Sequence, residues 1–155
     1  MMTFGSTEVS EITGVNGKTL HHWDMTGLVS PSAQRAHGKG TRKRYGFNDL
    51  LAIRLITGLR DAGVSLQSLR KVADYIRREL GPAEDLGNVF LVTDGHDVYL
   101  RQGDSLVSAL RERGQRLMFT VVDLAAAAEE LRQDVLRFRE PKPAAKGGKR
   151  PSRAG

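Results

Sequence analysis

Apolar residues in the first half of the chain recur at the three- and four-residue spacing of helices that bury one face. Leu51, Leu55 and Leu59 follow at four-residue steps in a predicted helix that opens at Phe47 or Asn48 and closes near Gly63. Two short helices are predicted before it, over 8–13 and 17–26. A further helix is predicted after it, from a cap at Ser65 to Leu80. The pattern thus predicts four helices within residues 6–80.

Cap and turn residues mark the ends of the two short helices. Thr7 and Asn16 are predicted N-caps, Gly14 forms the turn between the helices, and Gly27 ends the second one. The inner faces of the two helices and their turn carry Val9, Ile12, Val15, Leu20 and Trp23. Two short helices joined by a glycine turn predict a helix–turn–helix.

The pattern changes after residues 81–88 (GPAEDLGN), which we interpret as a linker. Strands are predicted at 89–93 (VFLVT), 97–101 (DVYLR) and 117–122 (LMFTVV), with a turn at 94–96 and a short helix between Asp104 or Ser105 and Gly114. Asp123 is the predicted cap of a last helix that stops at Pro141. Its apolar face carries Leu124, Ala128, Leu131, Val135 and Phe138. We expect a small α/β domain over 89–139, for dimerisation or for ligand or partner binding.

Positive charge is concentrated in two segments of a chain whose net charge is +6. Residues 25–48 contain no acid, and neither do residues 141–155. The cations of the second segment are Lys142, Lys146, Lys149, Arg150 and Arg153. The remainder of the chain is mildly acidic, and this segregation predicts a polyanionic partner. The tail 140–155 is too polar and too rich in Gly and Pro to order itself, and adds non-specific DNA affinity or only solubility.

Several function classes are excluded on composition. The chain has no cysteine, which excludes disulfides and thiolate metal sites. His21 and His22 diverge on a helix and cannot converge on one metal ion, and the acid–imidazole group around His96 fits a tight turn. We therefore expect no metal, no cofactor and no enzymatic activity. The N-terminus lacks signal-peptide features and no stretch is apolar enough to span a bilayer, so we expect a cytoplasmic protein.

Several motifs match a known family in order and spacing: the helix–turn–helix, TLHHWD-x-x-GL-x-x-P, RY-x-F-x-D-L and L-x-x-AGVSL-x-x-L. With these motifs, residues 6–80 resemble the DNA-binding domain of the MerR family. The resemblance implies a winged helix whose wing and second helix touch DNA. The expected fold class is α+β, a four-helix winged helix–turn–helix followed by a small α/β segment and a disordered basic tail.

Candidate DNA contacts lie on the second helix and on the predicted wing, residues 31–45. Lys18 and Thr19 occupy the first turn of a recognition helix, which approaches base edges. By resemblance, His22 stands where the family places a phosphate-binding Tyr, and Tyr45 packs at the wing base. The full set of predicted DNA-binding residues is Asn16, Lys18, Thr19, His21, His22, Arg35, Lys39, Arg42, Lys43, Arg44 and Tyr45.

The sequence therefore predicts a MerR-type transcriptional regulator that binds a pseudo-palindromic promoter site as a homodimer. The resemblance adds distortion of promoter DNA, RNA polymerase as a further partner, and a bacterial, nucleoid-associated location. Two alternatives stay open at this point. One is an antitoxin-like interaction protein with autoregulatory DNA binding, and the other is an architectural or excisionase-like DNA-binding accessory protein.

Overall fold

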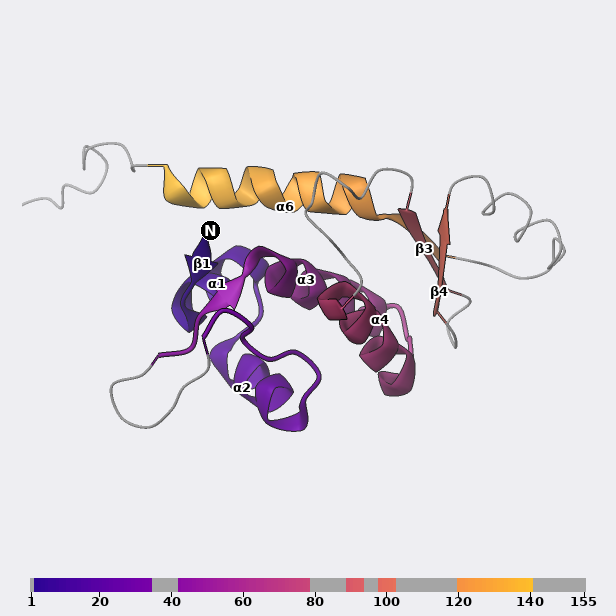
Figure 1. Ribbon diagram of the computed structural model, residues 1–155, viewed down its shortest axis with the longest axis horizontal. Coiled ribbons are helices and arrows are strands. Elements are labelled where there is room, and N and C mark those ends of the chain that lie inside the picture. Colours follow the sequence, from indigo (N-terminus) through magenta and orange to yellow (C-terminus); the bar gives the residue numbers. More distant parts are fainter. Residues whose placement is uncertain (1, 35–41, 79–88, 94–97, 103–119, 141–155) are drawn as a thin grey trace, which may run out of the picture.

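The computed structural model describes residues 2–34, 42–78, 89–93, 98–102 and 120–140. Helix α6 (Leu124–Arg139) crosses the top of the molecule in Figure 1, and α2 (Gly17–Thr26) lies at the bottom. Helices α1 (Ser6–Thr13) and α3 (Phe47–Asp61) lie between them, and a small sheet lies beyond α4 (Leu66–Arg78). The described residues thus form an α+β structure whose N-terminal part is a helix–turn–helix.

Helix α1 begins earlier than the sequence predicts. Its N-cap is Gly5, whose backbone N–H donates to Glu8 Oε1 at 3.0 Å. The predicted cap at Thr7 is wrong, because Thr7 lies inside the first turn of the helix. The carboxylate of Glu8 provides a bond at the helix start, and the chain is already fixed in direction there by a strand that ends at Phe4.

The predicted caps of α2 are confirmed. Asn16 Oδ1 accepts a hydrogen bond from the Thr19 backbone N–H at 2.8 Å, which satisfies one of the free donors at the helix start. Gly27 ends the helix with φ of 77°, in the left-handed region that suits glycine. Leu20 and Trp23 are buried, so the inner face of α2 is the one that the apolar spacing predicts.

A two-stranded sheet that the sequence did not reveal joins the N-terminus to the start of α3. Strand β1 (Thr3–Phe4) pairs antiparallel with β2 (Tyr45–Gly46), and Phe4 lies opposite Tyr45. An antiparallel bridge between Gln34 and Arg44 closes the base of the predicted wing. Residues 35–41 of that wing lie outside the described residues.

Helix α3 carries the apolar stripe that the sequence predicts, and Leu51, Leu55 and Leu59 are all buried. Near its start, Asp49 is only 6% exposed. Its Oδ2 accepts from the backbone N–H groups of Ser32 at 2.9 Å and of Gly46 at 2.8 Å. Asp49 thereby fixes both flanks of the predicted wing to the start of α3.

Helix α4 starts as the sequence predicts, because Ser65 Oγ accepts from the Ser68 backbone N–H at 3.2 Å. The structure describes this helix to Arg78, so its predicted end at Leu80 lies outside the described residues. The predicted linker at 81–88 does too.

The C-terminal strands form a three-stranded antiparallel sheet in the order β4-β3-β5. The strands are β3 (Val89–Thr93), β4 (Val98–Gln102) and β5 (Thr120–Asp123). These confirm the predicted hairpin strands and the later part of the third strand. Asp123 Oδ1 accepts from the Ala126 backbone N–H at 3.2 Å, which confirms the predicted cap of α6. The predicted turn at 94–96, the short helix before Gly114 and the tail after Glu140 lie outside the described residues.

The apolar stripe of α6 packs against α3 and α1 of the same chain. Its members are almost fully buried: Leu124, Ala128, Leu131 and Val135. An arginine joins the three helices, since Arg54 of α3 lies 2.5 Å from Asp134 of α6 and donates to the Ile12 carbonyl of α1 at 2.9 Å. Buried residues on both sides of the predicted linker thus form one cluster, and the division into two domains stays a prediction.

Candidate nucleic-acid interface

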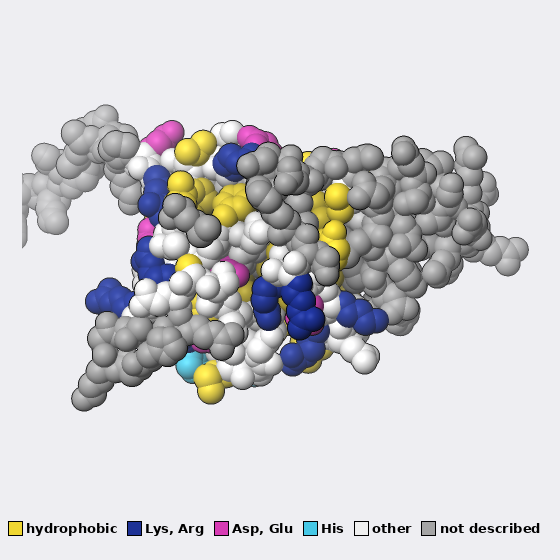
Figure 2. Space-filling view, viewed as in Figure 1, with side chains coloured by type: hydrophobic (Ala, Val, Ile, Leu, Met, Phe, Trp, Pro, Cys, Tyr) yellow, Lys and Arg dark blue, Asp and Glu magenta, His cyan; other side chains and the backbone are white. Residues whose placement is uncertain are grey.

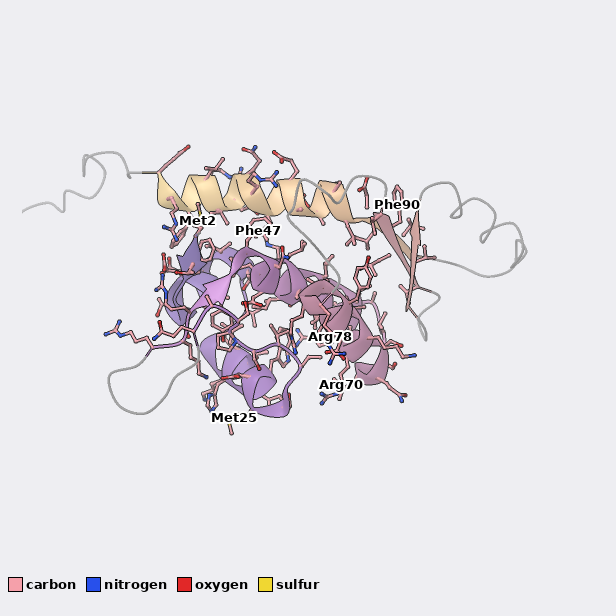
Figure 3. The ribbon with its side chains drawn as sticks, viewed as in Figure 1. Met2, Met25, Phe47, Arg70, Arg78 and Phe90 are labelled. Carbon is pink, nitrogen blue, oxygen red and sulfur yellow. The ribbon has the colours of Figure 1, made fainter. Side chains whose placement is uncertain are left out.

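The outward face of α2 presents polar side chains to solvent. Lys18, His21, His22 and Met25 are exposed, and they follow the helical spacing of one stripe. Leu20 and Trp23 point into the core from the other side. Met25 is 71% exposed and projects at the bottom of Figure 3. Sequence reasoning missed it as an interface residue, although its place seven residues after Lys18 could have revealed it.

Two of the predicted contacts at the start of α2 also serve the helix itself. The side chain of Asn16 is exposed but its Oδ1 is occupied by the cap bond to Thr19. The Thr19 side chain is half-buried. Lys18 is therefore the predicted contact in the first turn that is fully exposed.

Lys43 connects the wing base to α2. Its Nζ lies 2.7 Å from Asp24 Oδ2, and 3.3 Å from His21 Nδ1. The Lys43 and Asp24 side chains are only 22% and 19% exposed, so the ion pair is partly shielded from solvent. Two predicted DNA contacts from distant parts of the sequence, His21 and Lys43, are thus in direct contact with each other.

Arg44 turns inward, although the sequence places it among the DNA contacts. Its guanidinium donates to the Thr3 carbonyl at 3.0 Å and to Thr3 Oγ1 at 2.9 Å, and lies 3.9 Å from Glu8. Arg139 from the end of α6 donates to the same Thr3 carbonyl at 3.1 Å. Arg44 therefore holds the wing base to the N-terminal strand, and we assign it to that role.

Tyr45 is also on the inside, with 1% of its surface exposed. Burial, together with the nearby charges of Asp24 and Asp49, raises the pKa of Tyr45 to about 12. A ring this deeply buried cannot reach DNA. The packing of Tyr45 at the wing base agrees with the position that the resemblance implies, and we no longer count it as a DNA contact.

Among the remaining wing residues, Arg42 is exposed. It lines an open pocket beside the first turn of α1, together with Gly5, Ser6, Thr7, Glu8, Lys43 and Arg44. Arg35 and Lys39 lie outside the described residues, and as DNA contacts they stay predictions.

Arginines that the sequence analysis did not select surround the C-terminal end of α2. Arg70 donates to the Thr26 carbonyl at 3.1 Å, and Arg77 donates to the Leu28 carbonyl at 3.1 Å. Arg60 lies 5.6 Å from the centre of the Trp23 ring. Arg70 and Arg78 of α4 are labelled in Figure 3, and Figure 2 shows a dark-blue group of Lys and Arg side chains on this face. The basic stretch of α4 was the available sequence signal.

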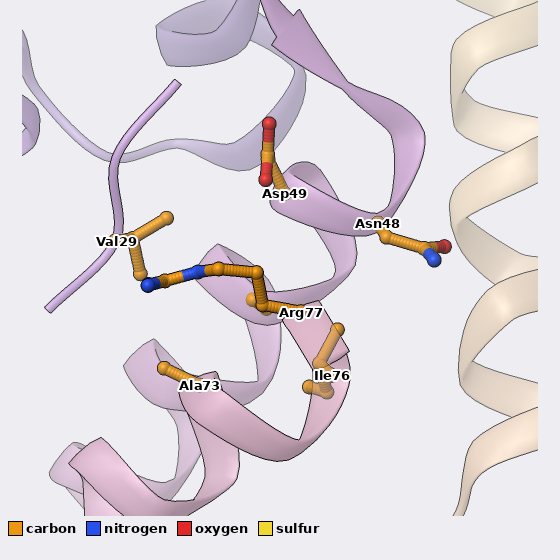
Figure 4. Close-up of a pocket in the computed structure, with 7 residues that line it drawn as sticks. Val29, Asn48, Asp49, Ala73, Ile76 and Arg77 are labelled. Carbon is orange, nitrogen blue, oxygen red and sulfur yellow. The ribbon is translucent and has the colours of Figure 1, made fainter. Parts of the chain in front are cut away.

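A second pocket lies between α3, α4 and the segment after α2 (Figure 4). Its charged lining residues are Asp49 and Arg77, and both already have partners in the chain. This pocket therefore offers a ligand mainly apolar wall, from Val29, Ala73 and Ile76. No group of three or more metal-ligating side chains occurs among the described residues. Within that same part of the chain, no helix is both long and apolar enough to cross a membrane.

An exposed polar face on the second helix of a helix–turn–helix, beside an arginine-bearing loop base, defines the class of DNA-binding helix–turn–helix proteins. Comparison with known proteins gives the family. Residues 4–76 match the model of the MerR HTH family regulatory protein. This N-terminal part of the chain belongs to the MerR family.

Similar proteins are named as transcriptional regulators. An uncharacterised HTH-type transcriptional regulator of Mycobacterium tuberculosis is 34% identical over 105 residues, which cover 68% of this chain and 46% of that protein. The HTH-type transcriptional regulator HmrR of Sinorhizobium medicae is 30% identical over 84 residues, or 54% of this chain and 55% of that protein. The nodulation protein NolA of Bradyrhizobium elkanii is 34% identical over 67 residues, or 43% of this chain and 29% of that protein. The chain thus spans about half the length, or less, of these curated relatives.

Proposed function

We propose that this protein is a sequence-specific transcriptional regulator that binds a pseudo-palindromic promoter site as a homodimer and acts without catalysis. The observation that carries the proposal is the outward stripe of Lys18, His21 and His22 on α2, joined to the wing base through Lys43. In helix–turn–helix proteins the second helix reads base edges in the major groove. The family of residues 4–76 and the regulator names of its relatives support the same reading.

The wing supplies affinity and register in this proposal. Arg42 is exposed and would contact a phosphate, as would Arg35 and Lys39. Lys43 is expected to contribute less to phosphate binding, because its ammonium is already paired with Asp24 at 2.7 Å. Bending and untwisting of the promoter spacer, with an effect on RNA polymerase, completes the proposed mechanism.

Dimerisation is proposed on symmetry, since a two-fold site needs two copies of the reading helix. The apolar stripe of α6 is occupied by α3 and α1 of the same chain. The contact between two copies is therefore expected to use other surfaces than that stripe. Sedimentation of the full chain with and without its selected DNA site would give the number of chains in each state.

The test of the DNA-binding proposal is a salt titration on a DNA site obtained by in-vitro selection. The slope of log affinity against log salt falls by about 0.9 for each phosphate that the protein no longer neutralises. Arg42→Ala should lower it by nearly two for a two-chain complex. Arg137→Ala is the matched control, because Arg137 is a 70% exposed arginine on α6, across the molecule from α2 (Figure 1). No selected site, or equal slopes for both variants, would contradict the proposal.

The same selection separates the alternatives. A single two-fold site in a promoter spacer supports the regulator, and several sites at a recombination end support the accessory protein. A partner protein that co-purifies at fixed stoichiometry with the full chain supports the antitoxin-like protein.

A further inference from the structure

The contact between Lys43 and His21 constrains the chemistry of the recognition helix. Lys43 Nζ lies 3.3 Å from His21 Nδ1, and 2.7 Å from Asp24 Oδ2. His21 and Asp24 stand three residues apart on α2, so a single ammonium from the wing base spans one turn of the helix. The lysine is held in place by the stronger, charged contact with Asp24.

An ammonium group has only donors. In the contact with Lys43, His21 Nδ1 must therefore be the acceptor, and it carries no proton. A neutral imidazole has one proton, which then resides on Nε2. Lys43 thus determines both the tautomer and the orientation of the His21 ring.

We propose that Lys43 is a positioning residue that holds His21 in the tautomer with its proton on Nε2, so that Nε2–H donates to an acceptor atom of DNA. This inference rests on the proposed function, because it deepens the role of the same face of α2. His21 is exposed on the outward stripe with Lys18 and His22. The acceptor is a phosphate oxygen, or N7 or O6 of a guanine, the acceptors that duplex DNA offers in the major groove.

The inference also separates Lys43 from the other wing cations. Arg42 is exposed and has room to meet a phosphate, whereas the side chain of Lys43 is 22% exposed and its charge is balanced by Asp24. A direct phosphate contact by Lys43 would compete with this ion pair. The lysine acts through His21, and its removal should matter only while the imidazole is present.

The first experiment measures the tautomer without DNA. In the full chain labelled with 15N-histidine, long-range 15N–1H spectra at about pH 8 distinguish a protonated from an unprotonated ring nitrogen. We expect His21 to have an unprotonated Nδ1, and Lys43→Met to shift the tautomer balance of His21 while His22, the control on the same helix, is unchanged. A protonated Nδ1 in the wild-type protein, or an unchanged balance in Lys43→Met, would overturn the inference.

The second experiment measures binding to the selected DNA site. A glutamine amide can place its NH2 group near the position of Nε2, whereas the shorter asparagine amide reaches only as far as Nδ1. We expect His21→Gln to bind within about threefold of wild type and His21→Asn about tenfold more weakly, the effect of one hydrogen bond to a polar or charged acceptor. Equal binding by both variants would overturn the donor role of Nε2. Far-UV circular dichroism checks that each variant is folded.

A double-mutant cycle tests whether Lys43 is a positioning residue. Lys43→Met should weaken binding in the wild-type background, have a clearly smaller effect in the His21→Ala background, and leave the salt slope unchanged. An equal weakening in both backgrounds with a lower slope would make Lys43 a phosphate contact and overturn the inference. If the wild-type protein binds no DNA, the proposed function itself fails, and the 15N spectra still decide how Lys43 acts on His21.

Discussion

Leu131 tests whether α6 is part of the structure that carries the DNA-binding face. It is fully buried on the inner face of α6, which packs against α3 and α1. Truncation of a buried leucine to alanine costs about 2–5 kcal/mol, from reduced burial and from the cavity that remains. We expect Leu131→Ala to lower the free energy of unfolding of the helix–turn–helix by about 3 kcal/mol, although Leu131 lies far from it in sequence.

Urea denaturation followed by tryptophan fluorescence measures this effect. The chain has a single tryptophan, Trp23, which is 6% exposed on α2. Its signal therefore reports unfolding of the helix–turn–helix and not of α6. With a denaturant dependence of about 2–3 kcal/mol per molar urea, the destabilisation corresponds to a midpoint lower by about 1 M.

Leu136→Ala is the matched control, because Leu136 lies on the same helix with 50% of its surface exposed. The two substitutions have the same effect on helix propensity but differ in burial, so the control should change stability by less than about 0.5 kcal/mol. If Leu131→Ala moves the Trp23 transition no further than Leu136→Ala does, the reasoning is refuted, and α6 does not stabilise the helix–turn–helix.

Three further predictions concern buried or paired groups. Because the pKa of Tyr45 is raised to about 12, its neutral form stabilises the fold fully below pH about 10, and about 3 kcal/mol is lost as the pH rises to about 12; in alkaline unfolding, Tyr45→Phe should not show this decrease. Asp49→Ala leaves the donors of Ser32 and Gly46 without their carboxylate and should cost about 3 kcal/mol in thermal unfolding, and a change below about 1 kcal/mol would contradict the bracing role. The hydrogen bond from Arg54 lowers the pKa of Asp134, so its contribution is present above the ordinary aspartate range and is lost on acidification; Asp134→Asn should flatten the acid limb of stability against pH.

The helices of the N-terminal part could be predicted because their signals are local. Asn16, Gly27 and Ser65 act on backbone groups within a few residues, and each was correctly placed from its type and position. The Thr7 prediction was wrong for a non-local reason. Strand β1 pairs with β2, some forty residues later in the chain, and this pairing sets the direction in which α1 begins.

The candidate site was predicted only in part. The outward stripe of α2 followed from helical geometry once Leu20 and Trp23 were assigned to the core. Among the wing cations, the sequence could not distinguish Arg42, which is exposed, from Arg44, which is bound to Thr3 and Glu8. Charge alone shows that a residue attracts anions, and the nearest anion can be a carboxylate of the same chain.

The sequence by itself determined the helix–turn–helix, its outward face and its resemblance to the MerR family, because these depend on periodicity and on caps within a few residues of each other. Only the tertiary structure decided that α6 packs on α1 and α3, and that Lys43 meets Asp24 and His21. Such contacts join residues about 20 to more than 100 positions apart. They form where folded surfaces fit, and no local pattern in the chain specifies which charge meets which partner.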